Sequence, residues 1–104
     1  MPTRDYKETI RARVRRDPAF KDALLKEAIE CLLSGDLETG KAILKDFIKA
    51  TTGFAALSKT VNKNPESLIR MLGPKGNPTA NNLFQIIAQI QKHEKLNMEV
   101  SLSR

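Results

Sequence analysis

Side chains that could read the edges of nucleic-acid bases gather between positions 63 and 70 of this chain. Arg70 can donate two hydrogen bonds to the O6 and N7 atoms of guanine, and Glu66 can accept one from the amino group of cytosine. Ser67 can bond to bases or to phosphate. The segment therefore has the chemistry of a base-reading surface, and the predicted base-reading residues are Lys63, Pro65, Glu66, Ser67, Ile69 and Arg70.

A second group of residues, on both sides of the first, is suited to holding a phosphate backbone. The lysines supply charge, the asparagines supply amide donors, and the small main chain at Gly76 and Asn77 permits close approach. The amides that start a helix near residue 80 could also bind phosphate. The predicted backbone-contacting residues are Lys59, Lys75, Gly76, Asn77 and Asn81.

Two short helices must position these side chains, and residues 54–72 predict a helix-turn-helix. Apolar residues repeat with helical spacing before and after a break at 62–64: Phe54, Leu57 and Val61, then Leu68, Met71 and Leu72. The break contains two asparagines, which tolerate left-handed backbone, and Asn64 followed by Pro65 is a good start for a helix. Such a motif places its second helix in the major groove of DNA.

Cap and stop signals predict helices over most of the remaining chain. The expected ranges are 4–16, 18–33, about 37–51 and 80–93, with Asp17, Asp36 and Thr79 as caps of the last three. We therefore expect one all-α domain over residues 1–104, a bundle of about six helices. Met98, Val100 and Leu102 alternate with polar residues, which predicts a short C-terminal strand at 97–102 that would need a partner strand.

Charge is distributed unevenly along the 104 residues, whose net charge is +6. Residues 1–52 contain eleven Lys and Arg against nine Asp and Glu, whereas residues 53–104 contain seven against three. The positive surplus thus lies in the half with the base-reading segment, as neutralisation of phosphate requires. The basic run from Arg11 to Arg16 has acidic neighbours and is interpreted as a solvated face.

Several classes of protein are disfavoured by what the sequence contains. One cysteine and one histidine permit neither an internal disulfide nor a zinc site, and no run approaches the roughly 20 apolar residues of a membrane span. No secretory signal is recognisable, so we expect a cytoplasmic protein. Cys31 fits an inert core thiol, and His93 suits the end of a helix. No catalytic set or phosphate-binding glycine loop is evident, so we expect neither enzymatic activity nor a cofactor or metal.

Three stretches between Thr3 and Leu102 resemble a known family: TRDYKETIRARVRRDPAF, LLSGDLETGKAILKDFIKATTGFAALSK and SLIRMLGPKGNPTANNLFQI. They are similar to the HigA-like antitoxins, the helix-turn-helix antidote proteins of bacterial addiction modules, and PKGNPT is the most distinctive piece. The resemblance implies the lambda-repressor-like fold. It also implies a protein that neutralises a small toxin of the RelE or HigB type and represses its own operon by binding double-stranded operator DNA.

The chain departs from the common repressor pattern at two positions, and two other functions remain open. Ser58 and Asn62 stand where many repressors have alanine and glycine; serine is small, and asparagine accepts a positive φ at modest cost. Two-fold operators lead us to expect a homodimer, and helix 4–16 is the expected partner-facing addition. The alternatives are a stand-alone transcriptional regulator and a protein-interaction module that has lost specific DNA binding.

Overall fold

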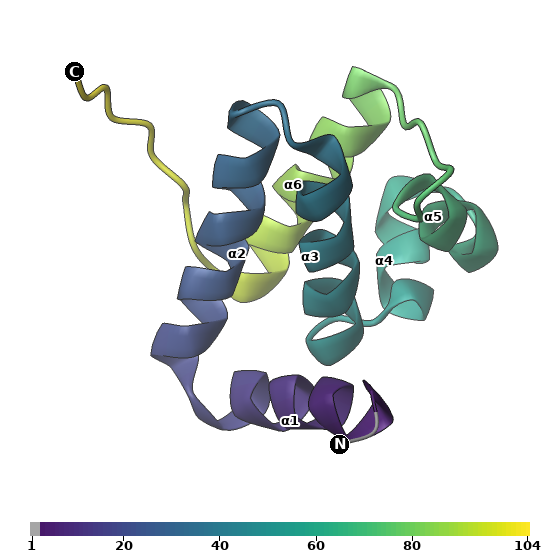
Figure 1. Cartoon of the computed structure of the whole chain (residues 1–104). Coiled ribbons are helices and arrows are strands. Elements are labelled where there is room, and N and C mark those ends of the chain that lie inside the picture. Colours follow the sequence, from purple (N-terminus) through teal and green to yellow (C-terminus); the bar gives the residue numbers. More distant parts are fainter. Residues whose placement is uncertain (1–2) are drawn as a thin grey trace.

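The chain folds into helices connected by short loops in a computed structural model that describes residues 3–104, with side chains from residue 10 onward. The helices are α1 (Thr3–Arg16), α2 (Pro18–Leu33), α3 (Leu37–Ala50), α4 (Phe54–Val61), α5 (Pro65–Met71) and α6 (Ala80–Glu94) (Figure 1). The predicted all-α class and the number of helices are confirmed.

Side-chain caps fix where the longer helices begin. Asp17 Oδ1 accepts a hydrogen bond from the Phe20 amide at 3.1 Å, and Asp36 Oδ1 accepts one from the Thr39 amide at 3.2 Å. Thr79 Oγ1 caps α6 by accepting from the amide of Asn82 at 3.1 Å. All three caps were predicted, because a short polar side chain before a helix satisfies an amide that has no intrahelical acceptor.

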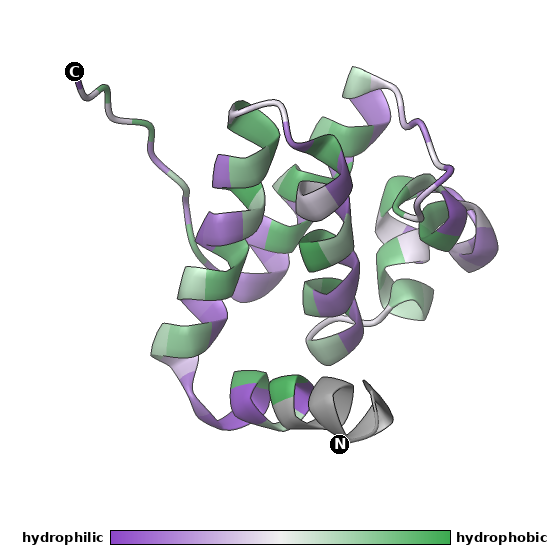
Figure 2. Cartoon of the chain, viewed as in Figure 1, coloured by the Kyte–Doolittle hydropathy of each residue, from purple (hydrophilic) through white to green (hydrophobic). Residues whose placement is uncertain are grey.

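The helices α2 and α3 form an antiparallel pair that packs on α6, and α4 also packs against α6 (Figure 1). Gly40 lets α2 and α3 approach closely, since a Cβ there would lie 2.6 Å from Leu32 Cδ2. Apolar residues of α2, α3, α4, α5 and α6 supply the core, and green segments occur on all five helices (Figure 2). The core consists of Leu25, Ala28, Leu44, Phe47, Ile48, Phe54, Leu57, Val61, Leu68, Leu72, Ile86, Ile87 and Ile90.

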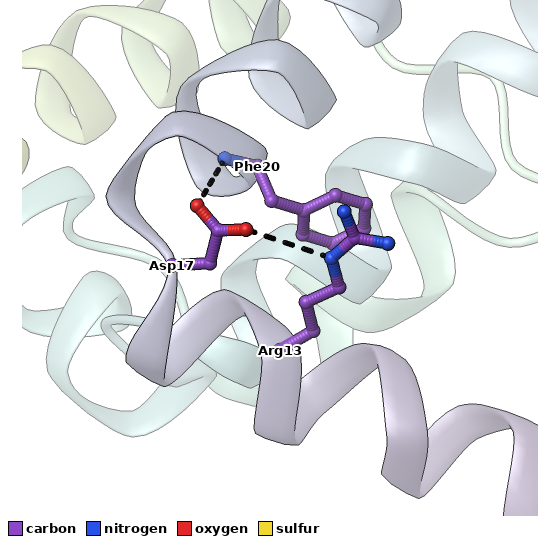
Figure 3. Close-up of polar contacts among 3 residues, drawn as sticks. All are labelled: Arg13, Asp17 and Phe20. Atoms are coloured by element: carbon purple, nitrogen blue, oxygen red, sulfur yellow. Dashed lines mark hydrogen bonds and ion pairs between the residues drawn. The ribbon is translucent and has the colours of Figure 1, made fainter.

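The helix α1 lies across one end of the α2–α3 pair and contacts both helices (Figure 1). Val14 is its buried residue among those described. At the junction with α2, the Arg13 guanidinium lies 4.3 Å from the centre of the Phe20 ring, and its Nε lies 3.6 Å from Asp17 Oδ2 (Figure 3). Arg13 therefore has a local structural role, while Arg11, Arg15 and Arg16 are exposed as expected of a solvated face.

The C-terminal tail, residues 96–104, is the place where the sequence-based expectation is wrong. No strand occurs within residues 3–104, and the tail is extended and runs away from the helices (Figure 1). The Met98 amide donates to Gln91 Oε1 at 2.8 Å, but Val100 and Leu102 are 84% and 86% exposed. The alternating pattern at 97–102 forms no strand in a single chain because no neighbouring strand is there to accept its hydrogen bonds.

An ion pair also joins the helices α2 and α6. Lys21 Nζ lies 2.6 Å from Glu94 Oε1, and the Glu94 side chain is only 8% exposed, so the start of α2 is tied to the end of α6. Within residues 3–104, no helix is both long enough and apolar enough to span a bilayer.

Candidate nucleic-acid interface

The connection between α4 and α5 has the tight geometry that the asparagines predicted. Asn62 ends α4 with φ 56° and ψ 45°, in the left-handed region, and the Lys63 amide donates to the Ser58 carbonyl at 3.2 Å. Asn64 then caps α5, since its Oδ1 accepts from the Ser67 amide at 2.7 Å. Asparagine tolerates the left-handed backbone at Asn62 better than most residues. The turn and the start of α5 are thus formed by local hydrogen bonds of residues 62–64.

The helix α5 has one face in the core and one in solvent. Leu68 and Leu72 are 0% and 2% exposed, and they anchor the helix. Helical periodicity places Glu66 and Arg70 on the side opposite these leucines, and both are exposed. Ile69 lies at the boundary, with 36% of its surface exposed. The two side chains with the best hydrogen-bonding capacity for base edges therefore share the outer face.

The other predicted base-reading residues are less accessible. Lys63, Pro65 and Ser67 are half-buried, and the Ser67 amide is already used by the Asn64 cap. Pro65 and Ser67 adjoin Glu66 in the first turn of α5, and Lys63 lies in the turn before the helix. The structure therefore places five of the six predicted residues on α5 and Lys63 in the turn before it, with Glu66, Ile69 and Arg70 the most exposed.

Four of the predicted backbone-contacting residues are exposed and come from three elements around α5. Lys59 is on α4, Lys75 and Asn77 are in the loop after α5, and Asn81 is in the first turn of α6. The amides of Ala80 and Asn81, at the start of α6, have no acceptor within their own helix and are suitable donors to an anion, whereas the Asn82 amide is used by the Thr79 cap. Exposed candidate phosphate donors therefore come from the helix before α5, from the loop after it and from the start of α6.

Gly76, the fifth predicted backbone contact, has a structural reason to be glycine within the protein itself. A Cβ at this position would overlap the carbonyl oxygens of Arg70 and Met71, at the end of α5. Its amide donates to the Gly73 carbonyl at 3.0 Å. The close approach that was predicted toward DNA is thus made, in this structure, toward the end of α5.

Lys41 belongs to this region and was missed by the sequence-based reasoning. It is only 6% exposed, and its Nζ donates to the Gly73 carbonyl at 3.2 Å and to the Gly76 carbonyl at 2.6 Å. The available signal was its spacing: Lys41 falls on the apolar period of α3, between Leu37 and Leu44, where a lysine is unexpected. A lysine on the buried face of a helix requires partners, and they lie far along the chain.

The stretch of chain that contains α4, α5 and the following loop is predominantly positive, although Glu38 and Asp46 of α3 line a pocket with Leu72, Gly73 and Pro74 at the end of α5. Glu66 is the only acidic residue between positions 47 and 93, a range that also contains the exposed Lys59, Arg70 and Lys75. Exposed cations near a polyanion strengthen binding and make it salt-dependent. Glu66 is therefore the one carboxylate on this predominantly basic stretch of chain.

The single cysteine and histidine lie outside this region. Burial raises the pKa of the Cys31 thiol, with Asp36, Glu27 and Glu30 raising it further, so the reactive thiolate is disfavoured at neutral pH. Cys31 is half-buried rather than fully in the core. His93 is exposed in the last turn of α6. Among the described side chains, no group of three or more His, Cys, Asp or Glu could hold a metal ion.

Comparisons with protein-family models, with curated proteins and with solved structures found no match.

Proposed function

We propose that the chain is a sequence-specific DNA-binding protein in which α4 and α5 act as a helix-turn-helix and α5 enters the major groove. The observation that carries this proposal is the division of α5 into two faces. Leu68 and Leu72 fix the helix in the core, while Arg70 and Glu66 face solvent. Arginine at such a position can recognise guanine, Glu66 can accept from cytosine, and Ile69 can contact a thymine methyl group.

The contacts that would orient α5 come from the surrounding elements. Lys59 and Lys75 supply positive charge on either side of the helix in the chain, and Asn77, Asn81 and the first amides of α6 supply neutral donors. Contacts of this kind fix the register of the protein on DNA, whereas Arg70 and Glu66 provide the discrimination between bases.

The resemblance to HigA-like antitoxins extends the proposal to an antidote with a lambda-repressor-like fold that represses its own operon as a homodimer. We assign the toxin-facing surface to α1 and the groove beside it, because α1 lies away from α5 (Figure 1). The groove has both apolar and charged walls; its lining residues are Ile10, Arg13, Phe20, Leu24, Glu27, Ile43 and Asp46. A mixed lining of this kind suits a protein partner.

The proposal is tested by fluorescence anisotropy with the duplex upstream of the chain's own gene, beside a scrambled duplex, over a series of salt concentrations. We expect a preference of ~10³ or more for the own duplex and a steep salt slope. Arg70→Ala should lower the preference by about 5- to 150-fold, which corresponds to about 1–3 kcal/mol for a lost bidentate contact, and leave the helical content unchanged. The matched control is Lys26→Ala, which removes one positive charge from an exposed position on α2.

The possible outcomes separate the proposed function from its two alternatives. A selection from a pool of random duplexes extends the test to operators elsewhere in the genome. Equal, weak and salt-sensitive binding to the own duplex, the scrambled duplex and the selected duplexes favours the protein-interaction module. Selective binding without neutralisation of a small toxin encoded beside the gene favours the stand-alone regulator. If Arg70→Ala abolished both operator selectivity and neutralisation in a folded protein, the assignment of the two roles to different surfaces would be wrong.

A further inference from the structure

The turn after α5 is organised around a buried positive charge. The Gly76 amide donates to the Gly73 carbonyl at 3.0 Å, which closes a four-residue turn with Pro74 and Lys75 at its centre. Proline is favoured at the second position of such a turn. Lys75 is exposed at its tip, and Asn77 follows directly. The turn therefore determines where two of the predicted phosphate donors lie.

Lys41 holds this turn at both of its ends. Its Nζ donates to the carbonyl of Gly73, the first residue of the turn, and to the carbonyl of Gly76, the last. Both recorded partners are main-chain oxygens, and the lysine is 6% exposed. An ammonium group loses its hydration when it is buried, so the two hydrogen bonds are needed to compensate. The turn and the lysine consequently stabilise each other.

The position of Lys41 on α3 links this turn to the core. Lys41 lies one turn before Leu44, which is fully buried, so its main chain is held by the packing of α3. The turn itself has no helix or strand, and Gly76 lies against the carbonyls that end α5. One side chain thus connects the core to the loop between α5 and α6.

We propose that Lys41 is a positioning residue for DNA binding, which fixes the turn at 73–76 so that Lys75 and Asn77 lie beside the base-reading face of α5. The proposal rests on the DNA-binding function proposed above. Because Lys41 is buried, it acts through these residues and contacts no phosphate itself.

The test compares Lys41→Met with Lys45→Met, which removes the same charge one turn later on α3 from a half-buried lysine. Hydrogen exchange should accelerate about tenfold or more at the hydrogen-bonded amides of Gly73 and Gly76 in Lys41→Met, beyond any change at α2 and α3. Exchange at these two amides should not change in Lys45→Met. Unchanged exchange at both amides in Lys41→Met would overturn the proposal.

DNA binding supplies a readout that a merely stabilising residue would not move. Lys41→Met should weaken binding to the own duplex about tenfold or more, with most of its salt slope retained if Lys75 remains free to find a phosphate. Lys75→Ala, which removes a direct contact, should instead lower the slope by about one. If the turn loosened in Lys41→Met while own-duplex affinity stayed unchanged, the positioning role would be overturned.

Acetylation of the unmodified protein covers the case in which Lys41→Met fails to fold. With an acetylating reagent and mass spectrometry, Lys41 should react about tenfold or more slowly than Lys59 and Lys75, and all three should react alike after unfolding. The own duplex should protect Lys75. Rapid acetylation of Lys41 in the folded protein, or a Lys75 that the bound duplex leaves reactive, would contradict the proposal.

The two proposals fail in different ways. If the unmodified protein showed no duplex preference, the proposed function would fall, and the DNA-positioning role would fall with it. The contact between Lys41 and the turn would nevertheless stand if exchange at the Gly73 and Gly76 amides still accelerated in Lys41→Met. A protein that prefers its own duplex but shows no effect of Lys41→Met would lose only the present inference.

Discussion

The loop after α5 and the tail after α6 both lack helical structure, but contacts within the chain hold them very differently. The loop at 72–79 has a buried lysine donating to two of its carbonyls and a glycine against the end of α5. The tail at 96–104 has the Met98–Gln91 hydrogen bond and the packing of Leu96 and Met98, after which its apolar side chains are exposed. Contacts within the chain therefore fix the conformation of the loop, whereas no such contact among the described residues fixes the conformation of the tail beyond residue 98.

This difference suggests different uses for the two segments. A loop with fixed polar groups can present its neighbours in one geometry without a partner, which reduces the ordering entropy that binding must overcome. An extended tail with exposed Val100 and Leu102 retains apolar surface that only another surface can cover. The fixed loop fits the DNA recognition proposed above, and the exposed tail fits the proposed homodimer.

The largest effect is expected at Gly76. Gly76→Ala places a methyl group against the Arg70 and Met71 carbonyls, so the turn or the end of α5 must shift, at a cost of about 1–3 kcal/mol in the free energy of unfolding. Gly73→Ala is the matched control, since its Cβ would lie 3.4 Å from the Arg70 carbonyl, an ordinary contact. Urea unfolding measures both. Equal losses for the two variants would show that the loop is not held as described.

A smaller loss is expected at the turn before α5. Asn64→Ala removes the hydrogen bond to the Ser67 amide and should lower the free energy of unfolding by about 1 kcal/mol. Asn77→Ala, an exposed asparagine in the loop, should leave stability unchanged but weaken DNA binding. Thermal unfolding and anisotropy on both variants make the comparison. A stability loss in Asn77→Ala, or none in Asn64→Ala, would contradict the division of roles.

The smallest effect on the single chain is expected in the tail. Val100→Ser combined with Leu102→Ser should change the free energy of unfolding of the monomer by less than about 0.5 kcal/mol, because both side chains are exposed. If the tail joins two copies in the proposed homodimer, the same variant should weaken self-association in sedimentation equilibrium. A clear loss of monomer stability would mean that the tail packs on its own domain.

The parts of the fold that depend on neighbouring residues were predictable. Asp17, Asp36, Asn64 and Thr79 each accept a hydrogen bond from an amide three residues later, and a sequence displays such signals directly. The positive φ of Asn62 was predictable for the same reason. Local chemistry therefore specifies the limits of the helices and the turn before α5.

Contacts over longer distances were not predictable, and they decide how the candidate site is held. Lys41 lies 32 and 35 residues from its two partners, so no local pattern connects them. The prediction of a strand in the tail was wrong for a related reason. Met98, Val100 and Leu102 have the alternation of a strand, but a strand forms only when a neighbouring strand pairs with it. Whether α5 reads DNA stays a prediction.

Two adjacent residues of α3, Gly40 and Lys41, make different contacts, and together they restrict which substitutions α3 tolerates. Gly40 lets the helix lie against Leu32 of α2, and Lys41, the next residue, reaches the turn after α5. A side chain at position 40 would require Leu32 to turn aside or α3 to move, and moving α3 would shift the base of Lys41. Substitutions at 32, 40 and 41 should thus be interdependent, with a larger residue at 40 tolerated best when 32 becomes smaller.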